Sequence, residues 1–205
     1  MTKRVQAKQK ICRSLGVNLW GSDKYNQDKI YPPGQHGPSN ILRRKSDYGI
    51  HLTAKQKLKK YYSNISEKQF RGIFKEAKRQ KGDAGANFIG LLEARLDAVI
   101  YRSGFVPSTF SARQLVSHKH VLVNGEIVNI PSYRLKIGDV VSIKNDSRNI
   151  PMILESLQKK DKDTVPYLKI DYKKCSTEFL AYPNLEDVPY PVTMEPNLIV
   201  EYYSK

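Results

Sequence analysis

The apolar pattern of residues 87–143 constrains the fold of this chain more than any other feature. Over residues 87–104, apolar side chains recur three and four positions apart, which predicts one helix with a buried face, closed by Gly104. Thr109 can cap a second, short helix that runs to about Ser117. Each predicted helix has one apolar side and must bury it against another element.

The same stretch then predicts two strands and a tight turn. Val121-Leu122-Val123 runs into Asn124-Gly125, a dipeptide that suits the positive φ values of a two-residue hairpin turn. A further strand is predicted at residues 140–143, after Gly138-Asp139. Helix, helix, strand, turn and strand in this order predict a small α+β module.

Upstream of this module the sequence predicts two more helices. Residues 53–62 read as a short helix with Thr53 as its cap. Ser66 followed by Gln69 forms a capping box for the next helix, which Gly82 ends. Its apolar residues share one face, so its basic residues can face phosphate: Lys68, Arg71, Lys75, Lys78 and Arg79.

Positive charge is concentrated in the first two-fifths of the chain. The net charge is +15, from 35 Lys and Arg against 20 Asp and Glu. Residues 1–82 hold 20 basic and 5 acidic residues, whereas residues 83–205 hold 15 of each. A solvated basic face is the simple alternative, but the excess extends over 82 residues. The excess of positive charge therefore indicates a polyanionic partner.

Residues 1–47 and the C-terminal part have weaker patterns. Residues 1–47 show little periodicity and include Tyr-Pro-Pro-Gly-Gln-His-Gly-Pro at 31–38, so we expect a basic, loop-rich arm that its partner orders. Pro151 can begin a short helix. Residues 167–170 and 198–202 look like short strands separated by prolines.

Several classes of function lack support in the sequence. The apolar runs are shorter than the roughly 18 residues of a membrane span, and the N-terminus does not resemble a secretory signal. Cys12 and Cys175 suggest a reducing cytosol, and no spacing of Cys and His predicts a metal site. Phosphate-binding glycine loops and a nucleophile elbow are absent from the sequence. We therefore expect no catalysis and no cofactor.

Residues 109–125 carry the clearest nucleic-acid pattern. Basic and hydrogen-bonding side chains gather at the end of the predicted short helix and in the turn after it: Arg113, Gln114, Ser117, His118, Lys119 and His120. Lys and Arg neutralise phosphates, and rings can stack on unpaired bases. The structural alternative is that Arg113 covers apolar surface with its stem.

Four motifs in order resemble the RNA-binding module named after ribosomal protein S-four. They are Arg95-Leu96-Asp97 through Ser103-Gly104-Phe105, then Ala112–His118, Val121–Gly125 and Gly138–Ile143. This module is also appended to pseudouridine synthases, tyrosyl-tRNA synthetases and a heat-shock RNA-binding protein. Further motifs resemble the bacterial-type S-four family across almost the whole chain: Pro33–Gly37, Ser46–Gly49, Lys55–Lys57, Glu67–Arg71 and Leu198–Lys205.

The resemblance implies a structural constituent of the cytoplasmic ribosome with no enzymatic activity. Such a protein is a primary binder of 16S rRNA in the small (30S) subunit, grips the 5′ domain and nucleates assembly of the subunit body. It neighbours ribosomal protein S-five and other small-subunit proteins, contributes to translational accuracy, and lies near the channel by which messenger RNA enters. Zinc, which four N-terminal cysteines hold in some members, does not carry over, because only Cys12 stands in that region.

The resemblance also implies an organisation and a set of contacts. We expect an α+β fold with a basic arm at 1–46, a helical lobe at 47–93 joined by 160–205, and an S-four-type RNA-binding domain at 94–157. Ser46, Asp47 and Tyr48 would begin the helical lobe beside the RNA. The residues expected to contact RNA are Arg43, Arg44, Lys45, Tyr48, Lys55, Lys57, Arg113, Gln114, Ser117, His118, Lys119, Asn124 and Gly125.

Two rival functions remain open at this point. Arg95-Leu96-Asp97 superficially resembles the catalytic tripeptide of pseudouridine synthases, but Asp97 falls inside a helical pattern here. An acidic helix residue paired with a nearby Arg is the alternative interpretation of Asp97. The other rival is a free RNA chaperone or messenger-binding regulator.

Overall fold

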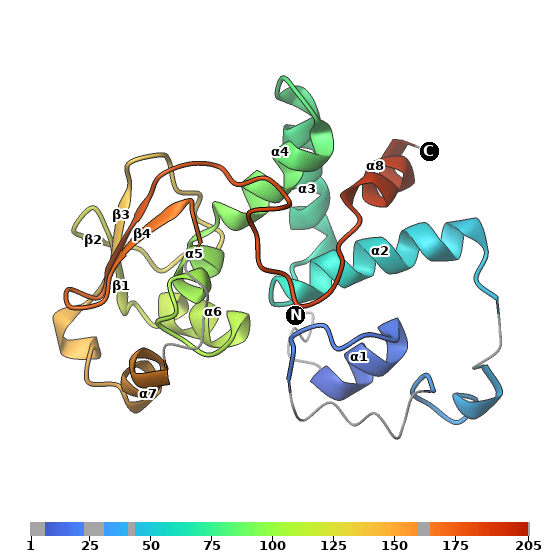
Figure 1. Ribbon diagram of the computed structural model, residues 1–205, viewed down its shortest axis with the longest axis horizontal. Coiled ribbons are helices and arrows are strands. Elements are labelled where there is room, and N and C mark those ends of the chain that lie inside the picture. Colours follow the sequence, from blue (N-terminus) through green and yellow to red (C-terminus); the bar gives the residue numbers. More distant parts are fainter. Residues whose placement is uncertain (1–6, 23–30, 41–43, 160–164, 205) are drawn as a thin grey trace. The chain divides into compact units, whose positions relative to one another are not determined.

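The computed structural model describes residues 7–22, 31–40, 44–159 and 165–204 (Figure 1). Helices and a five-stranded antiparallel sheet make up the fold, which confirms the predicted α+β class. The chain divides into two compact units, Met1–Gly72 with Tyr190–Lys205, and Ile73–Pro189. Among the described residues, none of the helices is long and apolar enough to cross a membrane.

The first unit is helical. It contains α1 (Lys8–Leu15), a 3₁₀ turn (Pro38–Asn40), α2 (Asp47–Tyr61), the first residues of α3 (Glu67–Arg79) and α8 (Pro196–Ser204). Helix α8 lies beside α2, although some 150 residues separate them in sequence, as the 2.7 Å hydrogen bond between His51 and Glu201 shows (Figure 1). The N- and C-terminal parts of the chain thus share one core.

Helix α2 begins six residues before the predicted cap. Ser46 is extended, with φ −68° and ψ 163°, and its Oγ accepts a hydrogen bond from the Gly49 amide. Asp47 places a negative charge in the first turn, where the helix dipole favours it. Thr53 lies inside the helix and donates its hydroxyl to the Gly49 carbonyl at 2.7 Å. The prediction of Thr53 as the cap was therefore wrong, because Ser46 offers a complete cap earlier.

The segment 198–202 is helical and not a strand. It belongs to α8, which begins at Pro196, a residue that fits the first turn of a helix. A short apolar run has the same appearance in a strand and in a buried helix, so periodicity alone could not decide between them. Ile199 is buried, and α8 is packed on α2.

Helix α3 follows its prediction closely. The Gln69 amide donates to Ser66 Oγ at 3.4 Å, so the capping interaction is present. Phe70, Ile73, Phe74 and Ala77 are all buried, as predicted. Gly82 follows the helix with φ +102°, a conformation that glycine adopts easily.

The second unit combines helices with the sheet. After the end of α3 come α4 (Ala84–Glu93), α5 (Leu96–Arg102), α6 (Thr109–Ser117), β1 (Val121–Val123), β2 (Glu126–Ile127), β3 (Val140–Ile143), a 3₁₀ turn (Asn145–Ser147), α7 (Pro151–Lys159), β4 (Leu168–Asp171) and β5 (Ser176–Phe179). Helix α7 begins at Pro151, as predicted. Helix α6 is capped by Ser108 Oγ, one residue before the predicted Thr109.

The helix predicted over residues 87–104 is two helices. The break falls at Arg95, which is extended with φ −73° and ψ 141°. Here the backbone bonds to a distant segment: the Leu96 amide donates to the Tyr133 carbonyl, and the Leu135 amide to the Ala94 carbonyl. These bonds replace helical ones, and sequence periodicity carries no information about them.

The sheet has the order β2-β1-β3-β5-β4, and every pairing is antiparallel. The predicted hairpin is confirmed: Leu122 pairs with Ile127, and Asn124 and Gly125 take φ values of 51° and 88°. Strands β4 and β5 come from the segment expected to join the helical lobe. They extend the sheet instead, because Val141 on β3 pairs with Thr177 on β5.

Candidate nucleic-acid interface

The predicted residues at the end of α6 form an exposed polar group. Gln114, Ser117, His118 and Lys119 are all exposed, whereas Leu115 and Val116 between them are buried. The His118 amide closes the helix on the Gln114 carbonyl, and Lys119 then turns the chain with φ +64°. The structure thus brings four predicted contact residues together at one helix end.

Arg113 lies beside this group but is partly enclosed. Its side chain is 23% exposed, and its Nη1 is 3.5 Å from Oδ2 of Asp97. Asp97 also accepts hydrogen bonds from buried Arg95, at 3.0 and 2.7 Å. Asp97 therefore sits in a helix between two guanidinium groups, the geometry of a structural ion pair and not of an exposed catalytic acid.

Asn124 and Gly125 lie at the exposed tip of the hairpin, but the Asn124 amide is used within the protein. Its Oδ1 accepts from the Val140 amide and its Nδ2 donates to Oδ1 of Asp139, both at 2.9 Å. The side chain fastens the hairpin to the start of β3. A signal for this role was present in the sequence, since Gly-Asp before a strand marks a second turn.

The predicted residues of the arm are only partly described. Arg43 lies outside the described residues, whereas Arg44 and Lys45 are exposed. Tyr48, in the first turn of α2, is 63% exposed. These three described side chains offer two positive charges and an aromatic ring at the start of one helix.

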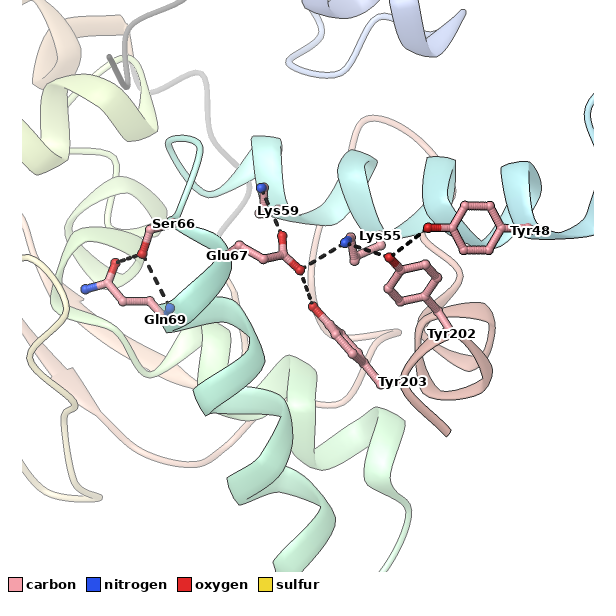
Figure 2. Close-up of polar contacts among 8 residues, drawn as sticks. All are labelled: Tyr48, Lys55, Lys59, Ser66, Glu67, Gln69, Tyr202 and Tyr203. Carbon is pink, nitrogen blue, oxygen red and sulfur yellow. Dashed lines mark hydrogen bonds and ion pairs between the residues drawn. The ribbon is translucent and has the colours of Figure 1, made fainter. Parts of the chain in front are cut away.

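Lys55 and Lys57 differ from the expectation, because both hold the C-terminal segment. Lys55 is 5% exposed, and its Nζ donates to Glu67 Oε1 at 2.9 Å and to the Tyr202 hydroxyl at 3.2 Å (Figure 2). Lys57 donates to the Thr193 carbonyl at 3.1 Å and approaches Glu195 at 3.4 Å. Their ammonium groups are engaged inside the unit, so they present less charge to a partner than the sequence predicted.

Glu67 is the electrostatic centre of this cluster (Figure 2). Its carboxylate accepts from Lys55, from Lys59 at 3.1 Å and from Tyr203 at 2.8 Å. Burial raises the pKa of Glu67, but the three hydrogen bonds outweigh burial and lower its pKa to about 2. Burial and the bond to Glu67 both raise the pKa of Tyr203. The carboxylate stays ionised and ties α2, α3 and α8 together.

Helix α3 carries a basic face that the predicted contact residues do not include. Its buried side is apolar, and its acidic Glu76 is paired with Arg134. Its outer cations stand three or four positions apart, so they share one face and form a row along the helix. The exposed residues of this row are Lys68, Arg71, Lys75, Lys78 and Arg79. The sequence had indicated the row through its periodicity.

Metal-ligating groups do not gather within the described part of the chain. No three residues among its His, Cys, Asp and Glu lie close enough to hold an ion. Cys12 is buried, which raises the pKa of its thiol. Cys175 is also buried.

Comparison with known proteins places the whole chain in one family. Residues 3–93 match the family model described as "Ribosomal protein S4/S9 N-terminal domain", and residues 94–141 match the "S4 domain". The small ribosomal subunit protein uS4 of Paramagnetospirillum magneticum is 55% identical, and those of Dinoroseobacter shibae and Granulibacter bethesdensis are 54% and 56% identical. Each match covers 100% of both chains. The chain belongs to the uS4 family.

Membership of uS4 confirms the resemblance drawn from the sequence motifs. It makes the chain a member of a family of structural ribosomal proteins of the small subunit, which is not a class of enzymes. The S4 domain of this uS4 chain contains α5, α6 and the hairpin β1–β2, with the exposed group at the end of α6. The exposed face of α3 lies within residues 3–93, which match the N-terminal domain of the family.

Proposed function

We propose that this uS4-family chain is a non-enzymatic component of the cytoplasmic small ribosomal subunit that binds the 5′ domain of 16S rRNA as a primary binder. The observation that carries the proposal is the exposed group Gln114, Ser117, His118 and Lys119 in an S4 domain. These side chains combine a cation, hydrogen-bonding groups and an imidazole ring, which suit phosphates and unpaired bases. The exposed cations of α3 supply charge that does not depend on base sequence.

The proposal includes an organisation of the chain. In this proposal residues 1–46 are the arm, in which Lys8–Leu15 is a helix and not the loop that was expected. Residues 47–93 are the helical lobe with the C-terminal helix, and 94–157 the RNA-binding domain, to which we add the strands β4 and β5. Support for this addition comes from the pairing of β5 with β3. The proposed RNA contacts are Arg43 and the other predicted residues apart from Lys55, Lys57 and Asn124. These three support the surface through their bonds within the protein.

The proposed setting is the assembled subunit. The chain would nucleate the body of the 30S subunit, lie against ribosomal protein S-five and other small-subunit proteins, contribute to translational accuracy and lie near messenger RNA as it enters. A free RNA chaperone is the rival, and sedimentation separates the two, since a chaperone should not migrate in equal amounts with mature small subunits.

Direct binding tests the proposal. We expect the chain to bind a 5′-domain 16S rRNA fragment more tightly than an unrelated structured RNA of equal length at the same salt concentration. Replacing Arg113 and His118 together by Ala should weaken binding, whereas replacing exposed Lys173 and Lys174 by Ala serves as the control. Equal affinity for the two RNAs would contradict the proposal.

Absence of catalysis has its own test. A uridine-isomerisation assay on rRNA should give no product with the natural chain. If the natural chain forms pseudouridine and the Asp97→Asn variant does not, the chain is an RNA-modifying enzyme and the proposal is wrong.

A further inference from the structure

Two tyrosines from distant parts of the sequence meet in the first unit. Tyr48 comes from the first turn of α2 and Tyr202 from α8 (Figure 2). Their ring centroids are 5.7 Å apart, the rings are inclined by 38°, and their hydroxyl oxygens are 3.4 Å apart. Tyr48 is 63% exposed, so much of its ring surface is available to a partner.

The Tyr202 ring is held from within the protein. The Lys55 ammonium lies 4.3 Å from its centroid and donates to its hydroxyl, while Tyr203 meets it edge to face at 5.2 Å. Lys55 is in turn fixed by Glu67. The Tyr202 hydroxyl thus shares hydrogen bonds with Lys55 and with the Tyr48 hydroxyl. Tyr202 is therefore held in place before any ligand arrives, and a ligand that stacks on it and Tyr48 loses less free energy on ordering the site.

The surroundings of Tyr48 carry positive charge suited to a nucleic acid. Arg44 and Lys45 are exposed just before α2, and Asp47 is the acidic residue in its first turn. Over residues 1–82, basic residues outnumber acidic ones by 20 to 5. An exposed ring beside flexible cations matches the chemistry of single-stranded RNA, in which a base stacks and its flanking phosphates meet Lys or Arg.

We propose that Tyr48 and Tyr202 form a stacking platform for an unpaired RNA base, with Arg44 and Lys45 contacting the phosphates on either side. This inference rests on the proposed function and names the class of ligand at this part of the surface. Every base has a π face, so the platform tolerates any sequence but requires that the nucleotide be unpaired.

The platform is tested with two RNA probes of equal length, a single-stranded oligoadenylate and its abasic counterpart, which keeps the phosphates and lacks the bases. The natural chain should prefer the oligoadenylate. Tyr48→Leu should lower the affinity for the oligoadenylate by about 5- to 150-fold, because stacking of one base on an aromatic side chain contributes about that much. It should leave the affinity for the abasic probe unchanged. Tyr48→Phe keeps the ring and should bind like the natural chain.

The salt dependence separates stacking from charge. Tyr48→Leu should lower the affinity without changing the slope of log K against log salt, whereas Lys45→Ala should make the slope shallower by about 0.7 for one single-strand phosphate contact. Tyr182→Leu, at a 47% exposed tyrosine of the second unit, is the control. If Tyr48→Leu binds both probes like the natural chain while the 5′-domain fragment is still bound, the platform is wrong and the proposed function stands. If the natural chain fails to prefer the 5′-domain fragment, the proposed function itself fails.

Discussion

At the scale of single residues, whether a charged side chain is buried or exposed depends on partners that are not its neighbours in sequence. Glu93 is fully buried because Arg102 donates to both carboxylate oxygens, at 3.0 and 2.9 Å, and Tyr167 donates at 2.9 Å. Lys55 was predicted as an RNA contact, yet Glu67 and Tyr202 hold it inside. In contrast, the exposed positions of Gln114 and Ser117 followed directly from helical spacing.

The buried pair of Glu93 and Arg102 gives a prediction at this scale. Arg102→Met should lower the free energy of unfolding by about 3–5 kcal/mol, because it leaves a buried carboxylate without its cation. Denaturant unfolding followed by circular dichroism measures the change. Lys173→Met, at an exposed position, should change stability by no more than about 0.5 kcal/mol. Equal stability of the two variants would show that the pair is not required.

At the scale of helices and strands, local signals located most elements but not all of their ends. Capping and periodicity predicted α3, α6 and the hairpin, since the residues that define them are neighbours in sequence. They missed the break at Arg95 and the helical state of α8, because both depend on contacts with distant segments. Strands β4 and β5 likewise joined the sheet through a partner some 35 residues upstream.

The attachment of α8 should depend on pH through Glu67. Its pKa falls from 4.5 to about 2 in the folded protein, so its stabilising contribution is complete above pH 4.5 and disappears as the pH falls toward 2. Glu67 is 45% exposed, so solvent screening limits the contribution to about 1 kcal/mol or less. Hydrogen exchange of the α8 amides should accelerate, relative to the rest of the chain, over this pH range.

Glu67→Gln tests the assignment. In this variant α8 should exchange faster at neutral pH and lose most of its additional acid sensitivity. Glu155→Gln, at an exposed position of α7, is the control and should behave like the natural chain. An unchanged pH profile in Glu67→Gln would assign the acid sensitivity to other groups.

At the scale of the whole molecule, the charge asymmetry and the recognisable module lie in different parts of the chain. The excess of +15 falls in residues 1–82, whereas the S4 domain begins at residue 94 in a part with no net charge. The structure adds that four lysines of α2 and α3 do not contribute equally. Lys55 and Lys57 are engaged with the C-terminal segment, whereas Lys75 and Lys78 are exposed.

This difference predicts which cations control salt dependence. Replacing Lys75 and Lys78 together by Ala should make the slope of log K against log salt shallower by about 1.4–1.8 for the 5′-domain fragment, if each cation neutralises one phosphate. Replacing Lys173 and Lys174 by Ala removes the same charge from exposed positions outside α3, in the same unit as Lys75 and Lys78, and should leave the slope unchanged. Equal effects of the two pairs would mean that net charge, and not the α3 face, determines binding.

The central claim, that this chain grips the 5′ domain of 16S rRNA, is tested most directly by crosslinking in cells followed by sequencing of the bound RNA. The account predicts that crosslinks concentrate in the 5′ domain, and that mass spectrometry of the crosslinked peptides finds residues 44–48, the exposed face of α3 and residues 113–119. Crosslinks spread over messenger and other RNAs, without enrichment in the 5′ domain, would contradict it.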